Sequence, residues 1–353
     1  MATRAFHPTY AEADPSLAAF IARLPKTETH LHLEGAVPWE LLREFDPVRF
    51  AEPPPFWDPG FRYDSFEQFL ELILQYAAPW YTSPEHYGRA AGLVLAECQR
   101  QNVKYVETSV HLAAVAHAGS GPEVIAAVKE AARKAAPGLH VRVFLGLCRD
   151  DYERFPKEIA AAVNWEELDG LDLHGVETIP LQEWTAGVWR QARDNGKFTK
   201  AHAGEFGPAS FVREAVEVLG VTRIEHGVRA AEDPEVVALL RDRGVTLDVC
   251  PVSNLKLRVA PSIREHQIGL LHRAGVRCTV NTDDPFFFGN RLEDEYAALA
   301  LDAGFTRRDL ATLARNGFEA AVAGGLLSVV EAVPFVGEIE AMAVAAEQEA
   351  DLE

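Results

Sequence analysis

The stretch Thr29-His-Leu-His-Leu-Glu-Gly35 carries two imidazoles and a carboxylate on alternate positions of an otherwise apolar segment. Because side chains alternate between the two faces of a β-strand, His30, His32 and Glu34 would point the same way. Such a face could bind a metal ion, provided that other segments supply further ligands. Taken alone, the pattern is explained equally well by an edge strand with a solvated polar face.

Further titratable side chains fall at the ends of later apolar runs and suit the same chemistry. A catalytic zinc ion binds nitrogen and oxygen ligands on rigid elements and keeps one position for water. We therefore expect one Zn²⁺ per chain, bound by His30, His32, His202 and Asp283. In chain order, the later motifs are Asp172-Leu-His-Gly175, His202-Ala-Gly-Glu205, His226-Gly227 and Asn281-Thr-Asp-Asp-Pro285.

Two side chains beside the expected ligands could move protons. Zinc would make hydroxide available at neutral pH because it lowers the pKa of bound water from about 15.7 to about 7. Glu205 lies on the turn that leaves its strand, where it could transfer protons beside that water. His226 alone would more often be a core histidine, but its place at a strand end next to Gly227 favours catalysis.

The remaining candidates have structural alternatives. Asp283 and Asp284 could cap the helix that starts at Pro285, a common use of aspartate. Set beside the other ligands, the catalytic interpretation is favoured. His174 is expected to be structural. The other histidines show no grouping and are expected on the surface or in loops, namely His7, His86, His111, His117, His140, His266 and His272.

The elements that must position these side chains alternate along the chain. Helix-like stretches at residues 122–134 and 234–243 have apolar residues at i, i+3 and i+4 and a proline in the first turn. The alternation predicts a (β/α)8 TIM barrel, with an open doubly wound sheet as the alternative. The active site of such a barrel lies at the C-terminal ends of the strands. Strands are predicted at residues 28–33, 103–110, 140–147, 170–174, 198–203, 222–226, 246–250 and 277–281.

One domain is expected over residues 1–353, since no linker, internal repeat or phosphate-binding glycine motif occurs. Residues 41–83 are rich in proline and aromatic residues and too long for an ordinary connection. We expect extra helices over the barrel mouth there, as a lid-like insertion between strand 1 and helix 1. Residues 334–353 are rich in alanine and glutamate and predict an acidic helical tail.

Composition limits the partners. The chain has 353 residues and a net charge of -19, which disfavours nucleic acid and anionic membranes and favours a small uncharged or cationic ligand. No apolar run reaches the roughly 20 residues of a membrane span, and no signal-peptide core is recognisable, so a cytoplasmic location is expected. A homo-oligomer is left open. Reduced thiols are expected at Cys98, Cys148, Cys250 and Cys278.

Taken together, the motifs resemble the adenosine deaminase-like branch of the metal-dependent amidohydrolases, which are zinc barrels that hydrolyse the 6-amino group of purines. The matching segments follow the family's order and extend over nearly the whole barrel. They are residues 24–35, 170–177, 202–205, 223–227, 250–254 and 281–285.

The resemblance implies the same four zinc ligands and adds roles for their neighbours. Glu205 would protonate the purine N1 as hydroxide adds to C6, and His226 would orient that hydroxide. Asp284 would hydrogen-bond N7, and the backbone amide of Gly175 would meet N3. Ammonia would then leave to give the 6-oxo purine. A bridging carboxylated lysine at the end of strand four is missing from Asp172-Leu-His-Gly175, which favours one metal ion.

An adenosine-type nucleoside, deaminated to an inosine-type product, is the first expectation for the substrate. Glu34 argues against a nucleoside, because the nucleoside enzymes of the family usually carry an aspartate at this position, and that aspartate is associated with the sugar hydroxyls. Glutamate is typical of the adenine deaminases, so adenine is the alternative substrate. Residues 223–229 and 253–259 also resemble the adenine-type and aminodeoxyfutalosine-type members more than the adenosine enzymes. A modified nucleoside such as aminodeoxyfutalosine is therefore the third candidate.

A non-catalytic metal-binding barrel is the alternative from another functional class. Glu205 and Asp284 argue against it, because neither is an expected ligand and a binding module would not need both.

Overall fold

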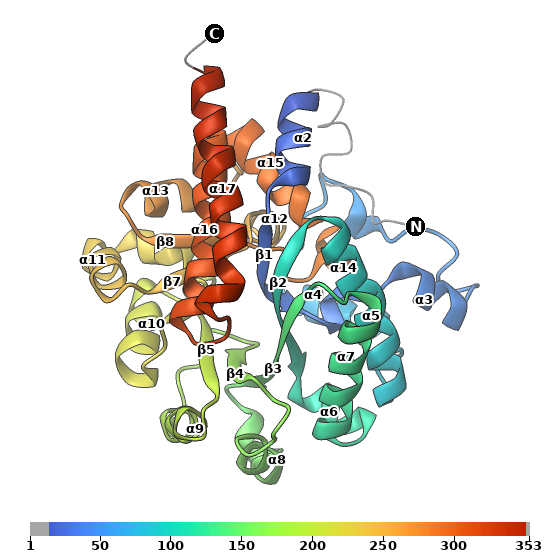
Figure 1. Cartoon of the computed structure of the whole chain (residues 1–353). Helices are drawn as coiled ribbons and strands as arrows, with labels where there is room; N and C mark the ends of the chain where they lie inside the picture. The colour runs from blue at the N-terminus through green and yellow to red at the C-terminus, as the bar shows by residue number, and fades with distance from the viewer. Residues whose placement is uncertain (1–13, 351–353) are drawn as a thin grey trace.

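A computed structural model describes residues 14–350 of the chain. Its eight strands form one sheet in the order β1 to β8, and each strand pairs in parallel with the next. An isolated parallel bridge between Leu31 and Asp283 brings the segment after β8 against β1. The sheet is thereby closed into a (β/α)8 barrel with helices around it (Figure 1). The predicted fold is confirmed.

The predicted strand ranges agree with the observed ones to within two residues at each end. They are β1 (Lys26–His32), β2 (Val103–His111), β3 (His140–Cys148), β4 (Gly170–His174), β5 (Phe198–Ala203), β6 (Arg223–His226), β7 (Thr246–Val249) and β8 (Arg277–Val280).

Strand β1 departs from strict alternation. Its register against β2 shifts between Glu28 and Leu31, and Thr29 Oγ1 donates a hydrogen bond to Asp248 inside the barrel at 2.8 Å. Glu34 is not on the strand at all, because the chain turns into the short 3₁₀ helix η1 (Glu34–Ala36). The expectation that Glu34 shares a strand face with the two histidines is therefore wrong.

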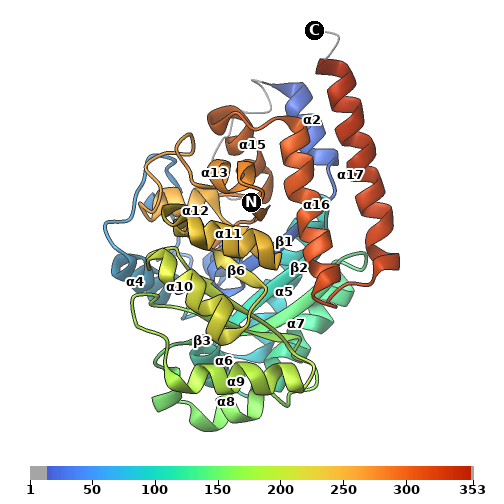
Figure 2. The same ribbon diagram turned by 90° about the vertical axis from the view of Figure 1, so that its left-hand side faces the viewer.

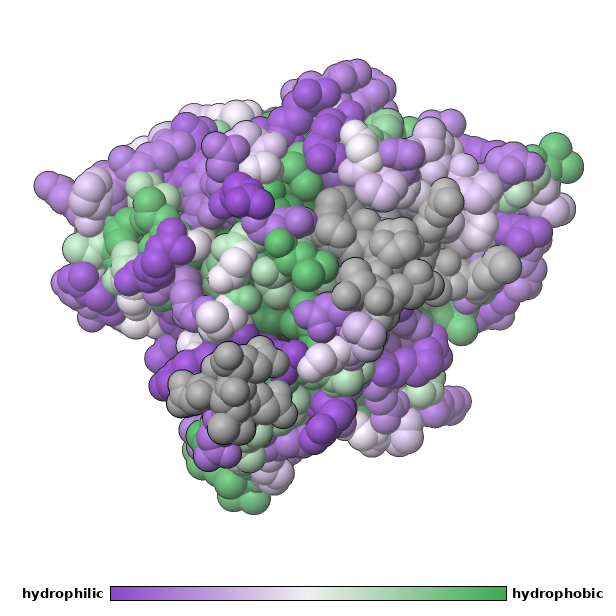
Figure 3. Space-filling view, turned by 90° about the horizontal axis from the view of Figure 1, so that it is seen from above, coloured by the Kyte–Doolittle hydropathy of each residue, from purple (hydrophilic) through white to green (hydrophobic). Residues whose placement is uncertain are grey.

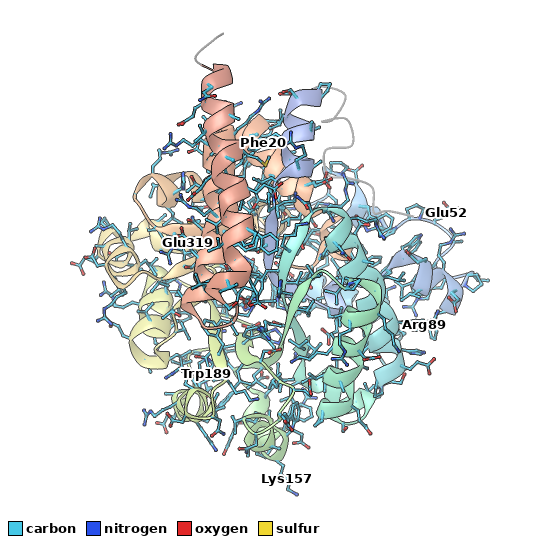
Figure 4. All side chains as sticks on the ribbon, viewed as in Figure 1. Phe20, Glu52, Arg89, Lys157, Trp189 and Glu319 are labelled. Carbon is cyan, nitrogen blue, oxygen red and sulfur yellow. The ribbon has the colours of Figure 1, made fainter. Side chains whose placement is uncertain are left out.

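Helices follow each strand and cover the outside of the barrel, and the two predicted from periodicity are α7 and α11. Trp189 of α9 faces the barrel wall, where its indole N–H donates to the Lys200 carbonyl oxygen at 3.2 Å, whereas Lys157 of α8 points outward (Figure 4). These helices are α5 (Pro84–Arg100), α6 (Leu112–Ala118), α7 (Gly121–Ala135), α8 (Pro156–Ala162), α9 (Glu183–Asp194), α10 (Ala209–Glu214), α11 (Pro234–Arg243), α12 (Pro251–Lys256), α13 (Ile268–Arg273), α14 (Pro285–Phe288), α15 (Leu292–Ala303) and α16 (Arg307–Ala323).

The two chain ends add helices to one side of the barrel. Helix α2 (Pro15–Arg23) precedes β1, and α17 (Val329–Ala350) follows α16. Figures 1 and 2 both show α17 alongside α16, on the side of the molecule away from α8 and α9. The helix in the region of the predicted tail thus begins five residues before residue 334.

The segment between β1 and α5 contains α3 (Trp39–Phe45), η2 (Pro55–Trp57) and α4 (Phe66–Tyr76), which lie in the region predicted as an insertion. On one side, the α4 ring of Phe69 stacks on Phe288 of α14 at 5.3 Å between centroids. On the other side, the ring of Phe66 contacts the ring of Phe206, a residue that follows β5, at 5.0 Å between centroids. The segment therefore extends from the loop after β8 to the loop after β5.

Several hydrogen bonds fasten this segment to α12 and α14. The Trp57 indole donates to the Phe286 carbonyl oxygen at 2.6 Å, and the Tyr63 hydroxyl donates to that of Phe287 at 2.8 Å. Lys256 Nζ donates to the Phe56 carbonyl oxygen at 2.6 Å. Helix α14 begins directly after Asp283 and Asp284, so the insertion packs against the segment that carries an expected ligand.

The face in Figure 3 is mostly hydrophilic, with apolar side chains gathered in separate patches. Across residues 14–350, no helix combines the length and apolar character needed to cross a lipid bilayer. All four cysteines are free, as expected.

Lys26 is a buried cation at the start of β1. Its Nζ donates to the carbonyl oxygens of Ile21 at 2.6 Å and Leu24 at 2.9 Å, at the end of α2. Burial lowers the pKa of this ammonium group from 10.5 to about 7, while Glu293 opposes the shift. The folded chain therefore releases this proton near neutral pH, but the unfolded chain keeps it to about pH 10.

We predict that Lys26→Met changes how stability depends on pH. Between about pH 7 and pH 10, Lys26 of the wild type is protonated in the unfolded chain but not in the folded one. The wild-type free energy of unfolding therefore increases with pH over this range, and the variant lacks this increase. Relative to wild type, the variant should lose about 2 kcal/mol more at about pH 9 than at about pH 6. Urea unfolding at both pH values measures this, and a constant difference would contradict it.

Candidate metal centre and active site

The four expected ligands converge at the mouth of the barrel. His30 and His32 come from the end of β1, His202 from β5 and Asp283 from the segment after β8. The His32 and His202 Nε2 atoms are 3.2 Å apart, and Asp283 Oδ1 lies 3.4 Å from His30 Nε2 and 3.3 Å from His32 Nε2. Bonds of about 2.0–2.1 Å to a tetrahedral zinc ion place ligand atoms about 3.3–3.4 Å apart. The set therefore fits one ion of that size.

The hydrogen bonds of the histidines direct their Nε2 atoms toward this centre. His30 Nδ1 donates to the Asp248 carbonyl oxygen at 3.1 Å, and His202 Nδ1 lies 2.8 Å from Glu225 Oε2 and 3.2 Å from Asp172 Oδ1. His30 Nε2 is buried without a hydrogen-bond partner in the described part of the chain. A buried ring nitrogen without a hydrogen-bond partner is costly, and a metal ion would satisfy it.

The electrostatics of the centre also favour a cation. Burial opposes a positive charge on His30 and His202, but nearby carboxylates outweigh this effect and raise the pKa of both imidazoles. Glu225 and Asp283 act on His30, and Glu225 and Asp172 act on His202. His32 has less compensation, and burial lowers its pKa to about 3. The carboxylates thus favour positive charge on the imidazoles that face the centre, and a divalent cation bound there would supply that charge instead.

A layer of buried charges supports the centre from inside the barrel. Lys200 Nζ lies 2.7 Å from Glu225 Oε1, so the carboxylate that holds His202 is itself paired. Arg223 pairs with Asp248 at 2.6 Å and with Glu107 at 3.2 Å. The sequence analysis missed this layer because it treated the strands as apolar. The available signal was a charged residue in each of four strand-like runs.

Glu205 and His226 lie side by side next to the ligands. Glu205 Oε2 is 3.4 Å from His226 Nε2, which is 3.7 Å from Asp283 Oδ2. Burial, with Asp283 and then Glu177 as like charges, raises the pKa of Glu205 well above its usual value. Glu177 Oε2 accepts the backbone N–H of Glu205 at 3.0 Å and that of Phe206 at 2.7 Å, which fixes the turn.

A hydrogen-bond chain sets the proton positions of His226. The Ile268 N–H donates to His266 Nδ1 at 3.0 Å, so His266 Nε2 carries the hydrogen that it donates to Asn254 Oδ1 at 3.2 Å. That bond orients the amide, whose Nδ2 donates to His226 Nδ1 and Glu205 Oε1, both at 3.2 Å. Because His226 Nδ1 accepts, its Nε2 carries the hydrogen that faces Glu205.

Asn254 and His266 are thus positioning residues that the sequence analysis did not find. His266 lies in the loop between α12 and α13, as expected, but it is buried there, and burial lowers its pKa to about 3. Its hydrogen-bond partners are Asn254 of α12 and the backbone N–H of Ile268, the first residue of α13. His174 and His111 also lie at the mouth, where their ring centroids are 5.1 Å apart. Because His111 is the last residue of β2 and is half-buried, the expectation of a surface or loop position is wrong for it.

The other expected histidines give mixed outcomes. His86 is half-buried and stacks on Trp80 at 4.4 Å between centroids, and His117 is exposed. His140 and His272 are half-buried and lie near Glu331 and Asp309, respectively. His7 lies outside the described residues.

Two turns at the centre hold strained backbone. His226 and Asp283 both have left-handed conformations, with φ of 61° and 66°. Side chains other than glycine avoid this region at a cost of about 1–3 kcal/mol, and such strain concentrates at functional sites. Gly35 has a different reason to be glycine, since a Cβ there would lie 1.6 Å from Asp284 Oδ1. The glycine of the first motif therefore admits Asp284 to the mouth.

The remaining expected substrate residues lie at the same mouth. Burial, with Asp283 as a like charge, raises the pKa of Asp284 well above its usual value. Gly175 follows β4 with a left-handed φ of 80°. Glu34 is buried, and its Oε1 accepts the Tyr87 hydroxyl at 2.6 Å and the His111 backbone N–H at 2.9 Å. Glu34 therefore ties the end of β1 to the end of β2.

Comparison with known proteins places this geometry in a family. The adenosine deaminase family model matches residues 25–325. The chain belongs to the adenosine deaminase family. This confirms the resemblance seen in the motifs and, with it, the expected class of enzyme, a deaminase-type hydrolase.

Relatives and solved structures agree with this membership. An adenine deaminase from Sphingopyxis alaskensis is 35% identical over 343 residues, which cover 92% of this chain and 97% of the relative. The structure of an adenine deaminase from Arthrobacter aurescens superposes with a TM-score of 0.79 at 26% identity, covering 90% of this chain and 98% of the other. An amidohydrolase from Burkholderia ambifaria with bound zinc gives 0.78 at 25% identity, covering 94% of each.

We predict that Asp172→Asn weakens metal binding at the centre. The change removes a charge 3.2 Å from His202 Nδ1 but keeps the shape, and partners of this kind typically contribute 10–100-fold to metal affinity. Because Glu225 still holds His202, the loss should be about 10-fold. Competition with a chromophoric zinc chelator measures it.

Ser109→Ala is the matched control. Ser109 Oγ donates to Asp172 Oδ2 at 3.1 Å, and no contact joins it to His202. This variant should bind zinc as wild type does, and an equal loss in both variants would show that packing around Asp172, not its charge, is responsible.

Proposed function

We propose that the protein is a zinc-dependent deaminase of a 6-aminopurine, and that its substrate is adenine, which it converts to hypoxanthine and ammonia. The observation that carries the proposal is the convergence of His30, His32, His202 and Asp283 beside the Glu205–His226 pair. The relatives named adenine deaminase support adenine above the adenosine-type nucleoside expected first. Neither relative's name specifies a nucleoside.

The four convergent side chains would hold one zinc ion, and the zinc-bound neighbour supports that choice of metal. Zinc, when bound, supplies a water-derived nucleophile at neutral pH because it lowers the pKa of water to about 7. Zinc binding requires neutral imidazoles and an ionised carboxylate, so the protons that the carboxylates now favour on His30 and His202 would be released on binding.

Glu205 would donate its proton to the purine N1. Burial and the neighbouring carboxylates raise its pKa well above the usual value and so favour the protonated carboxyl, and the Asn254 amide donates to Oε1, which would leave Oε2 to carry the hydrogen. His226 would orient the nucleophile through its Nε2–H, the tautomer that the Asn254–His266 chain selects. Proton transfer of this kind contributes about 10²–10⁴-fold to rate.

Asp284 would hydrogen-bond the purine N7 and the Gly175 backbone amide would hydrogen-bond N3, which are the roles that the family resemblance implies. The protonated form of Asp284 that burial favours could donate to N7, an acceptor. The buried metal ligands and the aromatic insertion exclude water from this reaction, which strengthens every polar contact to the base.

Glu34 supports a base over a nucleoside. Its carboxylate is buried in the wall of the mouth, where Oε1 accepts both Tyr87 and the His111 amide. Redirecting it toward sugar hydroxyls would leave a buried hydroxyl and a buried amide without their partner, at a cost of about 1–3 kcal/mol for each.

The partner would therefore be a small, uncharged purine. The net charge of -19 disfavours nucleic acid as a substrate, although the chemistry acts on a nucleobase.

Zinc-loaded protein should deaminate adenine with a kcat/KM at least about 10-fold above that for adenosine or aminodeoxyfutalosine, a gap of about 1.4 kcal/mol. Chromatography of the 6-oxo products and an ammonia assay measure all three reactions in parallel. A preference for either nucleoside would overturn the choice of adenine and keep the deaminase, whereas no turnover of any of the three would overturn the deaminase itself.

Glu205→Gln should lower kcat by about 100-fold or more while the zinc content stays equal to that of wild type, because the amide cannot give up a proton. Glu217→Gln, an exposed change on the helical segment after the same strand, is the control and should retain wild-type turnover. Metal analysis alongside the assay separates a lost proton donor from a lost metal ion. Normal turnover by the Glu205 variant would refute its assigned role.

A further inference from the structure

A second group of metal-ligating side chains lies at the barrel mouth beside the first. His111, Cys148 and His174 end the adjacent strands β2, β3 and β4. One ligand atom of each lies within 4.8 Å of those of the other two. None of the three belongs to the set expected to bind the catalytic zinc ion. They occupy the arc of the mouth between β1 and β5 that holds none of the catalytic ligands.

The two imidazoles point nitrogens at each other. His111 Nδ1 and His174 Nε2 are 2.9 Å apart. Burial lowers the pKa of both rings, so both are neutral, the form in which histidine binds metal ions. In the absence of a metal ion, one nitrogen must donate its hydrogen to the other. A cation between them would accept both lone pairs.

The surrounding backbone is shaped to this cluster. A Cβ on Gly146 would lie 2.1 Å from the His174 ring, and a Cβ on Gly175 would lie 2.5 Å from Cys148 Sγ. Only glycine leaves room for both side chains. The His111 backbone is fixed as well, because its N–H donates to Glu34. Donors held in this way lose little entropy when they bind an ion.

We propose that His111, Cys148 and His174 form a second metal site, distinct from the catalytic centre, for a divalent transition ion of the zinc type. Two imidazoles and one sulfur suit Zn²⁺ and its neighbours in the first transition row, whereas Mg²⁺ and Ca²⁺ require oxygen ligands. Three protein ligands leave a fourth position for water or substrate.

Binding at this site exchanges a proton for the metal ion. Burial keeps the Cys148 thiol protonated, so the S–H bond breaks as the S–metal bond forms and the proton goes to solvent. No electron transfer is involved. The affinity of this site for the metal ion should therefore rise about tenfold per unit of pH over the range in which the free Cys148 thiol is protonated.

The second site would adjoin the first. The His174 ring is 5.4 Å from the His32 ring and 5.9 Å from the His202 ring, measured between centroids. An ion held there would lie beside Gly175, whose backbone amide is proposed to meet the base, so excess zinc should inhibit turnover. This consequence rests on the proposed deaminase, but the binding itself does not.

Cobalt(II) is the probe that distinguishes the two sites. The catalytic set contains only nitrogen and oxygen ligands, so the thiolate-to-cobalt charge-transfer band in the near ultraviolet reports on Cys148. Full-length protein stripped by chelator and titrated with Co²⁺ should bind two ions per chain and gain that band. Cys148→Ser should bind one ion without the band, and Cys278→Ser, the matched buried control, should bind two with it.

The result that would overturn the proposal is a single ion per wild-type chain, or a band that survives in Cys148→Ser. A band that survives in Cys148→Ser would show that the cobalt-binding thiolate belongs to Cys250, whose Sγ is 3.4 Å from His30 Nδ1. His111→Ala serves as a second variant that keeps every thiol, and it should weaken the band-forming step at least 10-fold. Circular dichroism confirms that each variant is folded. Absence of zinc inhibition with the band present would refute only the predicted effect on turnover.

Discussion

Two backbone hydrogen bonds between Asp283 and the end of β1 are the contact on which the site depends. The Asp283 N–H donates to the His30 carbonyl oxygen, and the His32 N–H donates to the Asp283 carbonyl oxygen, both at 3.0 Å. They close the barrel between its last and first strands. The same bonds bring an acidic ligand against two imidazoles from the other end of the chain. Closing the fold and assembling the metal centre are therefore one event.

Buried charge is arranged around that contact in layers. The candidate ligand His202 contacts Glu225 and Asp172, Glu225 pairs with Lys200, and Arg223 pairs with Asp248 and Glu107 deeper in the barrel. A buried ion pair contributes little net stability, because the cost of removing both charges from water cancels much of the attraction. We interpret the layers as orientation devices: they fix which imidazole nitrogen faces the mouth, which apolar packing cannot do.

The barrel and the convergence of the four candidate ligands were predictable from the sequence because both depend on local pattern. Strand ends are visible where apolar runs stop, and each candidate ligand stands at such an end. Partners far apart in the chain were not predictable in this way. His111 meets His174 across 63 residues, and no pattern around either one signals the other. Glu34 was misplaced because strand alternation was extended through the turn that begins at Leu33 and leads into η1.

The aromatic insertion has a mechanical consequence. Its α4 contacts the loop after β5, while Trp57 and Tyr63 bond to the carbonyl oxygens of Phe286 and Phe287 in α14. In the proposed enzyme, a displacement of the insertion that uncovered the mouth would pull on the short helix that directly follows Asp283 and Asp284. Exchange of product for substrate and retention of the proposed metal ion would then depend on the same hydrogen bonds, so a variant that opens faster would also hold its metal less tightly.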